Sequence, residues 1–271
     1  MKLRPIAAVA AITAAALLAG CSPETVPGPA LDEDTGITTV RIAATVTPMT
    51  DVVEAAADAV DASTVIELVP VSDYVQPNTL LQNQEIEANF VQHEAFMEDY
   101  NDKNDGSLVM VQPVYYVVAA FYSQTLSSLS ELGEGDSVVI ANDPSNAARA
   151  LQLLADEGVI ELDPAIERFE ARMGDITGNP LDLKITQVEL MQLNTAYDEA
   201  DAVFNLASFA RQIGLTPQDD GIAVEQDERF AVGLVAHEDS VNSSFIARAR
   251  EAFTSDLVRQ KLEELEVPPA F

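Results

Sequence analysis

The chain has 271 residues, of which 48% are hydrophobic, and 45 acidic against 14 basic residues give a formal net charge of −31. This length and hydrophobic content can supply two modest cores or one large core, which excludes wholesale disorder. The acidic excess argues against nucleic acid as a partner and against docking on anionic lipid by charge, because both need a basic surface. With one cysteine and two histidines, we expect no internal disulfide, no metal site and no cofactor.

The first 21 residues have the pattern of an export signal. Lys2 and Arg4 precede an alanine-rich apolar run over residues 6–18, which leads directly into residues 18–21 (LAGC). The run is too short for a convincing membrane span. Its ending resembles a bacterial lipobox, which implies a signal peptide over residues 1–20 and a lipid on Cys21. An ordinary signal peptide, or a short buried helix that holds a cysteine, is the alternative.

The segment that follows is rich in proline, glycine and acidic residues, with little that could pack. Residues 21–37 therefore predict a lipidated cysteine followed by a flexible acidic tether. The longest later apolar run, residues 114–122, is about half the length of a membrane span. We therefore expect a protein that is lipid-anchored through Cys21 at the extracytoplasmic face of the cell membrane.

From residue 38 onward, short β-branched runs alternate with amphipathic stretches. In chain order we expect strand 39–46, helix 50–61, strand 64–71, helices 77–83 and 94–101, a bent strand 108–122, strand 137–141, helices 144–157 and 164–172, strands 184–188, 202–205 and 230–236, and helices 240–252 and 255–265. Strands separated by helices predict parallel sheets and an α/β architecture.

Two polar, turn-rich segments interrupt this pattern, at residues 126–135 (LSSLSELGEG) and 216–229. If the chain crosses between two lobes there, one lobe holds residues 38–122 and 228–271, and the other holds residues 123–227. A ligand cleft would then lie between the lobes, at the carboxyl ends of strands.

Six short motifs follow one another along the chain. They are residues 73–78 (DYVQPN), 86–93 (IEANFVQH), 129–132 (LSEL), 142–149 (NDPSNAAR), 179–180 (NP) and 212–217 (QIGLTP). Each is weak alone, but their order resembles the NlpA-type methionine-binding lipoproteins, the substrate-binding proteins of ABC importers. This resemblance covers nearly all of the chain after the signal.

The resemblance implies a two-lobed periplasmic-binding-protein fold, type II-like, with no enzymatic activity. It also implies capture of a small amino acid, methionine or a relative, for the permease and ATPase subunits of an importer.

Arg149 is the first candidate ligand contact. Asp143 and Pro144 predict the start of a helix, and Arg149 follows just over one turn later. A guanidinium beside the free N–H groups of a helix N-terminus suits a carboxylate. The resemblance supports this role and places the side chain at a cleft rather than in the core. The alternative is a surface arginine paired with one of the many acidic residues.

The resemblance also implies that His93 lines the cleft and that Tyr74 and Tyr115 form aromatic walls, although each residue is equally compatible with a place in the core. Phe90 is a further candidate wall. It departs from the family pattern, because the order here is Phe90-Val91 before the Gln-His pair, so the aromatic wall can also come from the other face or be missing.

Asn205 fits a family position at a strand end, where an amide oxygen could accept a hydrogen bond from a ligand ammonium. The alternatives are a one-residue shift, which leaves Ser208 as the contact, and a helix-capping role for Asn205. Gly233 stands where family members often place an asparagine in the penultimate strand. Loss of that contact puts methionine itself in doubt.

Two other classes of function stay open. An anchored hydrolase is disfavoured because the sequence holds no G-x-S-x-G and no H-E-x-x-H motif, although a glycosidase built on paired carboxylates is compatible with the abundant acids. The second alternative is an envelope interaction lipoprotein that keeps the fold but has lost or changed its ligand.

Overall fold

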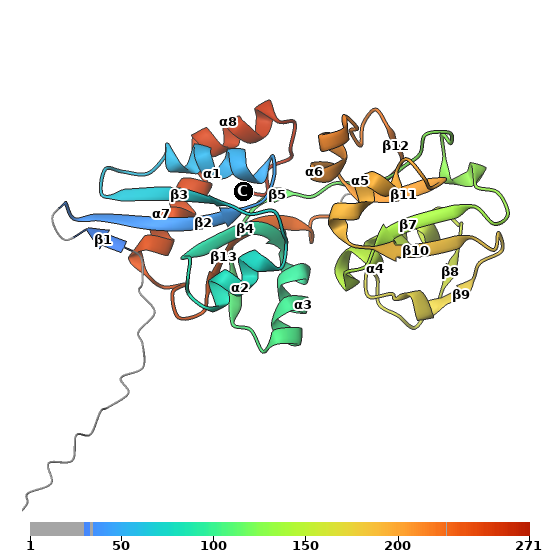
Figure 1. Ribbon diagram of the computed structural model, residues 1–271, viewed down its shortest axis with the longest axis horizontal. Helices are drawn as coiled ribbons and strands as arrows, with labels where there is room; N and C mark the ends of the chain where they lie inside the picture. Colours follow the sequence, from blue (N-terminus) through green and yellow to red (C-terminus); the bar gives the residue numbers. More distant parts are fainter. Residues whose placement is uncertain (1–29, 33–34, 226) are drawn as a thin grey trace, which may run out of the picture.

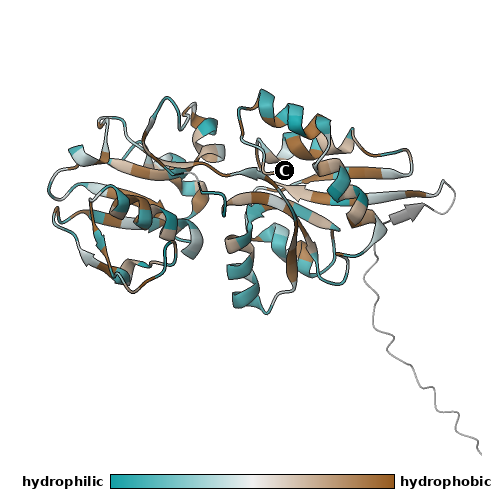
Figure 2. Cartoon of the chain, turned by 180° about the vertical axis from the view of Figure 1, so that it is seen from behind, coloured by the Kyte–Doolittle hydropathy of each residue, from teal (hydrophilic) through white to brown (hydrophobic). Residues whose placement is uncertain are grey.

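The computed structural model describes residues 30–32, 35–225 and 227–271, so the expected signal peptide and Cys21 lie outside the described residues. The chain forms two lobes side by side, each built on one central sheet with helices on both faces (Figure 1). Apolar side chains concentrate on the strands and on the inner faces of the helices (Figure 2). None of the helices in the described ranges has the length and hydrophobicity that a bilayer crossing requires.

The first lobe contains both the start and the end of the described chain. Its elements are β1 (Ala30–Asp32), β2 (Ile37–Ala44), α1 (Met49–Ala57), β3 (Thr64–Pro70), α2 (Gln76–Gln82), β4 (Ala88–His93), α3 (Glu94–Asn104), β5 (Leu108–Tyr116), β13 (Ala231–His237), α7 (Ser244–Phe253) and α8 (Asp256–Glu264). The strand order is β1-β2-β4-β13-β5, and β3 also pairs with β2. Helices α1, α7 and α8 lie on one face and α2 and α3 on the other. Every residue of β4 and β13 is therefore buried.

The second lobe is formed by the middle of the chain. Its elements are β6 (Ala119–Tyr122), β7 (Ser137–Ala141), α4 (Pro144–Asp156), β8 (Glu161–Leu162), β9 (Ile176–Gly178), β10 (Lys184–Val188), α5 (Leu193–Ala196), β11 (Ala202–Leu206), α6 (Ala207–Ala210) and β12 (Gly221–Glu225). Short 3-10 turns cover Leu129–Glu131, Met173–Asp175, Leu190–Gln192 and Arg211–Ile213. The order β10-β7-β11-β6-β12 places β11 at the centre, with all five residues buried. Helix α4 lies on one face of this sheet, and α5 and α6 lie on the other (Figure 1).

Helix α4 shows how local sequence sets an element that later bears on the site. The Asp143 carboxylate accepts a hydrogen bond from the backbone N–H of Asn146 at 2.9 Å, and Pro144 takes the first helical position. Ala147, Leu151 and Leu154 recur at helical spacing and are buried against the sheet. The predicted start of this helix is confirmed.

The first crossing between the lobes differs from the expected one. The apolar run that we expected to be one bent strand is two strands in different sheets, β5 and β6, joined at Val117 and Val118. The Val117 N–H donates to the Phe230 carbonyl at 2.7 Å, and the Val118 carbonyl accepts from the Ala207 N–H at 3.0 Å. Residues 119–122 thus belong to the second lobe, and the polar segment 126–135 lies inside that lobe. Burial on both sides of the crossing keeps the run apolar throughout, which hides the change of sheet.

The second crossing lies between the end of β12 at Glu225 and the start of β13 at Ala231. The C-terminal residues run beside the first crossing: the Tyr116 N–H donates to the Pro268 carbonyl, and the Ala270 N–H donates to the Val114 carbonyl, both at 2.9 Å. The junction of the lobes is therefore built from three segments of chain.

Other expectations were wrong in detail. Residues 164–172 form turns rather than a helix, and β12 lies inside the segment that we expected to be a polar break. Residues 30–32, expected within the flexible tether, pair as β1 with β2. Strand β4 was not predicted, because its sequence (ANFVQH) mixes amides with apolar residues.

Candidate ligand-binding site

A small space, here termed the interlobe cavity, lies where the two lobes meet. It has a volume of about 20 Å³, room for about one water molecule. Its lining residues are Met49, Tyr74, Val91, Gln92, His93, Phe96, Val117, Asn146, Leu190, Leu206, Ser208 and Val232. The wall is mostly apolar and comes from both lobes and from the first crossing.

A wider opening, here termed the cleft mouth, adjoins the interlobe cavity and shares Tyr74, Phe96 and Leu190 with it. Its volume is about 450 Å³. Its charged lining residues are Asp73, Asp99, Asp143, Glu189 and Lys103. The route into the cavity is therefore strongly acidic.

His93 ends β4 and caps α3. Its Nδ1 accepts a hydrogen bond from the backbone N–H of Phe96 at 3.3 Å, so the proton of the neutral ring belongs on Nε2. Burial lowers the pKa of His93 to about 3, the positive charge of Arg149 adds to the effect, and an interaction with the Asn146 side chain acts in the opposite direction. The ring is 3% exposed, and Nε2 has no hydrogen-bond partner among the described residues. The cavity thus contains a buried, neutral N–H donor that lies near the Asn146 side chain and makes no hydrogen bond of normal geometry with the described residues.

Tyr74 lines both the interlobe cavity and the cleft mouth. Its hydroxyl accepts a hydrogen bond from Thr45 Oγ1 at 2.8 Å, and its ring lies 5.3 Å from the Phe209 ring of the other lobe, centroid to centroid. Burial raises the pKa of the hydroxyl above its ordinary value. Tyr74 is therefore an aromatic wall that also contacts the opposite lobe.

Phe90 and Tyr115, by contrast, lie in the core of the first lobe. The Phe90 ring is fully buried, 4.9 Å from the ring of Phe253 and 5.8 Å from that of Tyr115. Neither residue lines the interlobe cavity, whereas Val91 does. Tyr115 instead lines a separate small pocket of about 40 Å³ at the lobe junction.

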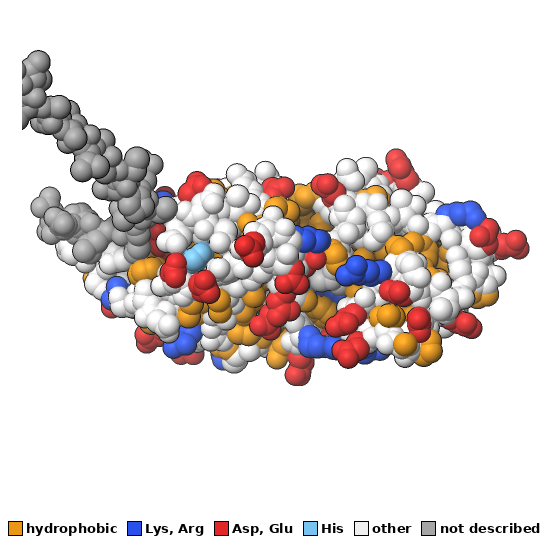
Figure 3. Space-filling model, turned by 90° about the horizontal axis from the view of Figure 1, so that it is seen from below, with side chains coloured by type: hydrophobic (Ala, Val, Ile, Leu, Met, Phe, Trp, Pro, Cys, Tyr) orange, Lys and Arg blue, Asp and Glu red, His pale blue; other side chains and the backbone are white. Residues whose placement is uncertain are grey.

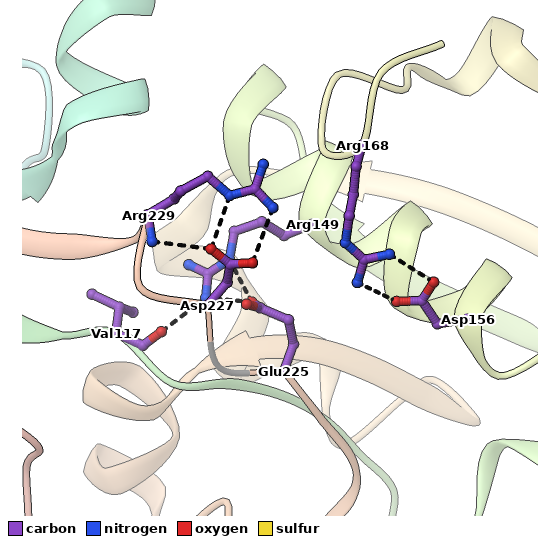
Figure 4. Close-up of polar contacts among 7 residues, drawn as sticks. All are labelled: Val117, Arg149, Asp156, Arg168, Glu225, Asp227 and Arg229. Carbon is purple, nitrogen blue, oxygen red and sulfur yellow. Dashed lines mark hydrogen bonds and ion pairs between the residues drawn. The ribbon is translucent and has the colours of Figure 1, made fainter. Parts of the chain in front are cut away.

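Arg149 is fully buried and already has a carboxylate partner (Figure 4). Its Nε donates to Oε2 of Glu225 at 2.7 Å, and Nη2 lies 2.5 Å from the same oxygen and donates to the Val117 carbonyl at 2.9 Å. The guanidinium lies over the Phe230 ring at 4.1 Å from its centroid. Arg149 lines neither the interlobe cavity nor the cleft mouth, but its Nη1 donates to Oδ1 of Asn146, which lines the cavity, at 3.4 Å. Its predicted contact with a ligand stays a prediction.

Asn205 is turned away from the cavity. Its amide nitrogen donates to Asn194 Oδ1 at 2.8 Å, and its own oxygen accepts from the Leu206 N–H at 2.9 Å. The next residue, Leu206, lines the cavity instead, because adjacent residues of a strand point to opposite faces. Ser208, in α6, lines the cavity as well. Of the two residues considered for this position, Ser208 lies at the cavity.

Gly233 also lies on the far side of its strand. A Cβ at this position would collide with the Met110 sulfur and the Gln112 backbone, so close packing against β5 explains the glycine. Val232 faces the cavity instead. At both positions where the resemblance implied an asparagine contact, the strand residue that lines the wall, Leu206 or Val232, is therefore apolar.

A buried amide cluster supports the cavity wall from behind and was not anticipated. Asn78 Nδ2 donates to Gln92 Oε1 at 2.9 Å, and Asn89 Nδ2 donates to Asn78 Oδ1 at 2.8 Å. Gln92 also lines the interlobe cavity. The signal was present in the motifs 73–78 and 86–93, which carry all three amides, and residues 86–93 are buried throughout.

Acidic, histidine and cysteine side chains in the described ranges form no group suited to a metal ion.

The family model described as NlpA lipoprotein matches residues 40–267. The chain belongs to the NlpA lipoprotein family. The family predicted from the motifs is thus confirmed.

Similar proteins and solved structures support the assignment of this chain to the family. The D-methionine-binding lipoprotein MetQ of Escherichia coli (strain K12) is 37% identical over 197 residues, which cover 71% of this chain and 72% of that protein. The probable D-methionine-binding lipoprotein MetQ of Haemophilus influenzae is 30% identical over 268 residues, 97% of this chain and 96% of that protein. The crystal structure of the methionine-binding protein MetQ superposes with a TM-score of 0.79 at 30% identity, covering 84% of this chain and 94% of that one. The predicted two-lobed fold is confirmed.

Proposed function

We propose that this chain is an extracytoplasmic substrate-binding protein that holds a small amino acid, methionine or a relative, between its lobes for an ABC importer. The observation that carries the proposal is the interlobe cavity, where the N–H of His93 is buried and unpartnered beside a mostly apolar wall. A buried donor without a partner is costly unless a ligand satisfies it. Relatives named for methionine binding support the same class of ligand.

Access to this cavity requires motion of the lobes. A space of about 20 Å³ holds about one water molecule, so an amino acid enters only when the lobes separate. The two crossings at Val117–Val118 and residues 227–230 provide the hinge. Closure on the ligand then brings Tyr74 of one lobe against Phe209 of the other.

The proposal includes a lipid anchor on Cys21 and delivery of the ligand to permease and ATPase subunits. The lipobox-like residues 18–21 and the lipoprotein character of the family support the anchor. A lipobox cysteine receives a diacylglycerol, and its two acyl chains are enough to hold the protein at the extracytoplasmic face without basic residues.

The test is calorimetric titration of a soluble protein that begins at Ser22 with both enantiomers of the amino acids and with small derivatives of methionine. Binding of a narrow set, accompanied by a smaller radius of gyration in X-ray scattering, supports the proposal. Absence of heat with every compound contradicts it.

A second candidate is an envelope interaction lipoprotein that keeps the fold and has lost or changed its ligand. The engagement of Arg149 by Glu225 and the apolar Leu206 and Val232 favour this alternative. Native mass spectrometry of protein purified from its own cells separates the two functions. A co-purified small molecule supports the binding protein, and an empty cleft that no tested compound fills supports the interaction protein.

A further inference from the structure

We propose that Phe169 is a positioning residue for ligand binding: its ring, carried by the second lobe, clamps the second crossing (residues 227–230) when the lobes are closed. Phe169 lines neither the interlobe cavity nor the cleft mouth, so it acts on a ligand through Phe230. This inference rests on the proposed function and extends it, because it concerns how long the lobes stay closed on a ligand.

The ring belongs to a segment that is fixed to the second lobe. Phe169 lies in the turns between β8 and β9, here termed the strap (residues 163–172). Its φ of +67° lies in the left-handed region, which bulky residues seldom adopt and which persists only where the surroundings hold it. Nη1 and Nη2 of the neighbouring Arg168 donate to the two carboxylate oxygens of Asp156, at the end of α4, at 3.0 and 2.6 Å (Figure 4). The strap is therefore expected to move with α4.

The Phe169 ring contacts two consecutive residues of the second crossing. The Phe230 ring meets it edge to face, with centroids 5.1 Å apart and an interplanar angle of 90°. Cζ of Arg229 lies 4.4 Å from the Phe169 centroid, and Cζ of Arg168 lies 4.7 Å from the same centroid. Edge-to-face rings and guanidinium groups over a ring are both favourable arrangements. The crossing is thus held from the side of the second lobe.

Two guanidinium groups share this ring because each has its own carboxylate. Nε and Nη2 of Arg229 donate to the two oxygens of Asp227, both at 2.9 Å, as Arg168 does to Asp156 (Figure 4). Figure 3 shows basic side chains next to acidic ones around the junction of the lobes. Repulsion between the two arginines is therefore offset locally.

Phe230 connects this clamp to the interlobe cavity. Its ring lies 5.2 Å from the His93 ring of the first lobe, centroid to centroid, and its carbonyl accepts from the Val117 N–H of the first crossing at 2.7 Å. Cζ of Arg149 lies over the same ring at 4.1 Å from its centroid, and Nη1 of Arg149 donates to Oδ1 of the cavity-lining Asn146 at 3.4 Å. A shift of Phe230 would therefore disturb the cavity wall from both lobes.

Opening of the lobes would separate these contacts, since Phe169 moves with the second lobe and His93 with the first. A contact that is made only in the closed form shifts the equilibrium toward that form. The clamp therefore slows release of the ligand. Entry takes place while the lobes are apart and does not depend on the clamp.

The test measures release of radiolabelled methionine during a chase with unlabelled methionine. It uses the soluble protein that begins at Ser22 and the enantiomer that the wild type binds more tightly. Phe169→Ala should raise the dissociation rate about tenfold and change the association rate by less than about twofold. Phe169→Tyr keeps the ring and should stay within about twofold of the wild type. Ile166→Ala removes an exposed apolar side chain of the same strap and is the matched control.

A second variant breaks the same contact from the side of the crossing. Arg229→Gln should raise the dissociation rate about threefold, whereas Glu228→Gln, at an exposed residue of the same crossing, should leave it unchanged. The double variant Phe169→Ala with Arg229→Gln should release the ligand no faster than Phe169→Ala alone, because the guanidinium then has no ring to cover. Additive effects of the two substitutions on the logarithm of the dissociation rate overturn the clamp. If Phe169→Ala does not fold, Arg229→Gln and its control decide.

A purely structural role for Phe169 gives a different result. Phe169→Ala would then lower the free energy of unfolding in urea and leave the dissociation rate unchanged, which overturns this inference and leaves the proposed function standing. If the wild type binds neither methionine nor any other amino acid, the proposed function fails, and X-ray scattering without ligand decides the clamp. A larger radius of gyration in Phe169→Ala than in the wild type then supports the clamp, and equal radii overturn it.

Discussion

Arg149 and Glu225 form a buried ion pair at the junction of the lobes, with Nε and Oε2 2.7 Å apart, although 76 residues separate them in sequence. Nη2 of the same guanidinium donates to the carbonyl of Val117 on the first crossing. The pair therefore links α4 and the end of β12 to the first crossing at Val117. We infer that Arg149 stabilises the junction of the lobes.

Arg149→Ala should destabilise the protein by about 3–5 kcal/mol, because it leaves the carboxylate of Glu225 buried without a partner. The measurement is urea denaturation followed by circular dichroism. The double variant Arg149→Met with Glu225→Leu removes both charges and should cost much less. An equal loss in the single and double variants would show that packing, rather than charge, accounts for the effect.

His93 should make stability depend on pH. Its pKa is about 3 in the folded protein and 6.5 ordinarily, so the unfolded chain takes up a proton that the folded protein does not. The contribution of neutral His93 to the free energy of unfolding is fully present above pH 6.5. It falls as the pH drops toward 3, by up to about 1.4 kcal/mol per pH unit. His93→Asn keeps a side-chain cap for α3 and should flatten this slope in urea titrations between pH 6.5 and 4. Parallel curves for the two proteins would contradict the prediction.

The amide cluster behind the cavity should be costly to disrupt. Asn78→Ala leaves Gln92 and Asn89 without their shared buried partner, so we expect a loss of about 2 kcal/mol or more in the free energy of unfolding. Asn83→Ala, an exposed amide at the end of the same helix, should change stability by about 0.5 kcal/mol or less. Comparable losses in both variants would indicate that the cluster contributes nothing specific.

Arg211 should favour the closed arrangement of the lobes. Its Nη2 donates to the backbone carbonyl of Leu265 at 2.8 Å, which joins the second lobe to the end of α8 in the first. Arg211→Ala should raise the radius of gyration in X-ray scattering and weaken ligand binding about three- to tenfold, because the closed form loses about 1 kcal/mol. Arg172→Ala, in a turn of the second lobe, serves as the control. Unchanged scattering and affinity in Arg211→Ala would rule this role out.

Cys21→Ser should release the protein from membranes, because a lipid on Cys21 is the one anchor that we expect and the acidic chain does not bind anionic lipid by charge. The measurement is fractionation of cells that express the variant, with Ser22→Ala as the control. A variant that stays in the membrane pellet would disprove the anchor.

Local sequence was sufficient to predict the bounds of those helices and strands whose formation depends mainly on their own residues. Strands β7 and β10 match their predicted bounds, because each is a short β-branched run between turns. The start of α4 follows from the Asp143 cap and Pro144. The order of the six motifs was sufficient to predict the family, and the family in turn predicted the two-lobed fold.

The residues that line the site could not be predicted from local sequence, because strand register and packing between strands decide which side chains face the cavity. Whether Asn205 or Leu206 faces the cavity is a matter of one residue of register, and a shift of one residue reverses the face of every side chain in a strand. Whether Val232 or Gly233 lines the wall depends on how closely β5 packs against β13.

The amino-acid sequence by itself determined the fold class, the family and the chemical types available to the site, since these follow from composition, periodicity and motif order. Only the tertiary structure decided that the apolar run changes sheets at Val117 and that Glu225 pairs with Arg149. The physical reason is that the free energy of a buried charge depends on which groups surround it in space, and the chain brings those groups together from positions that are distant in sequence.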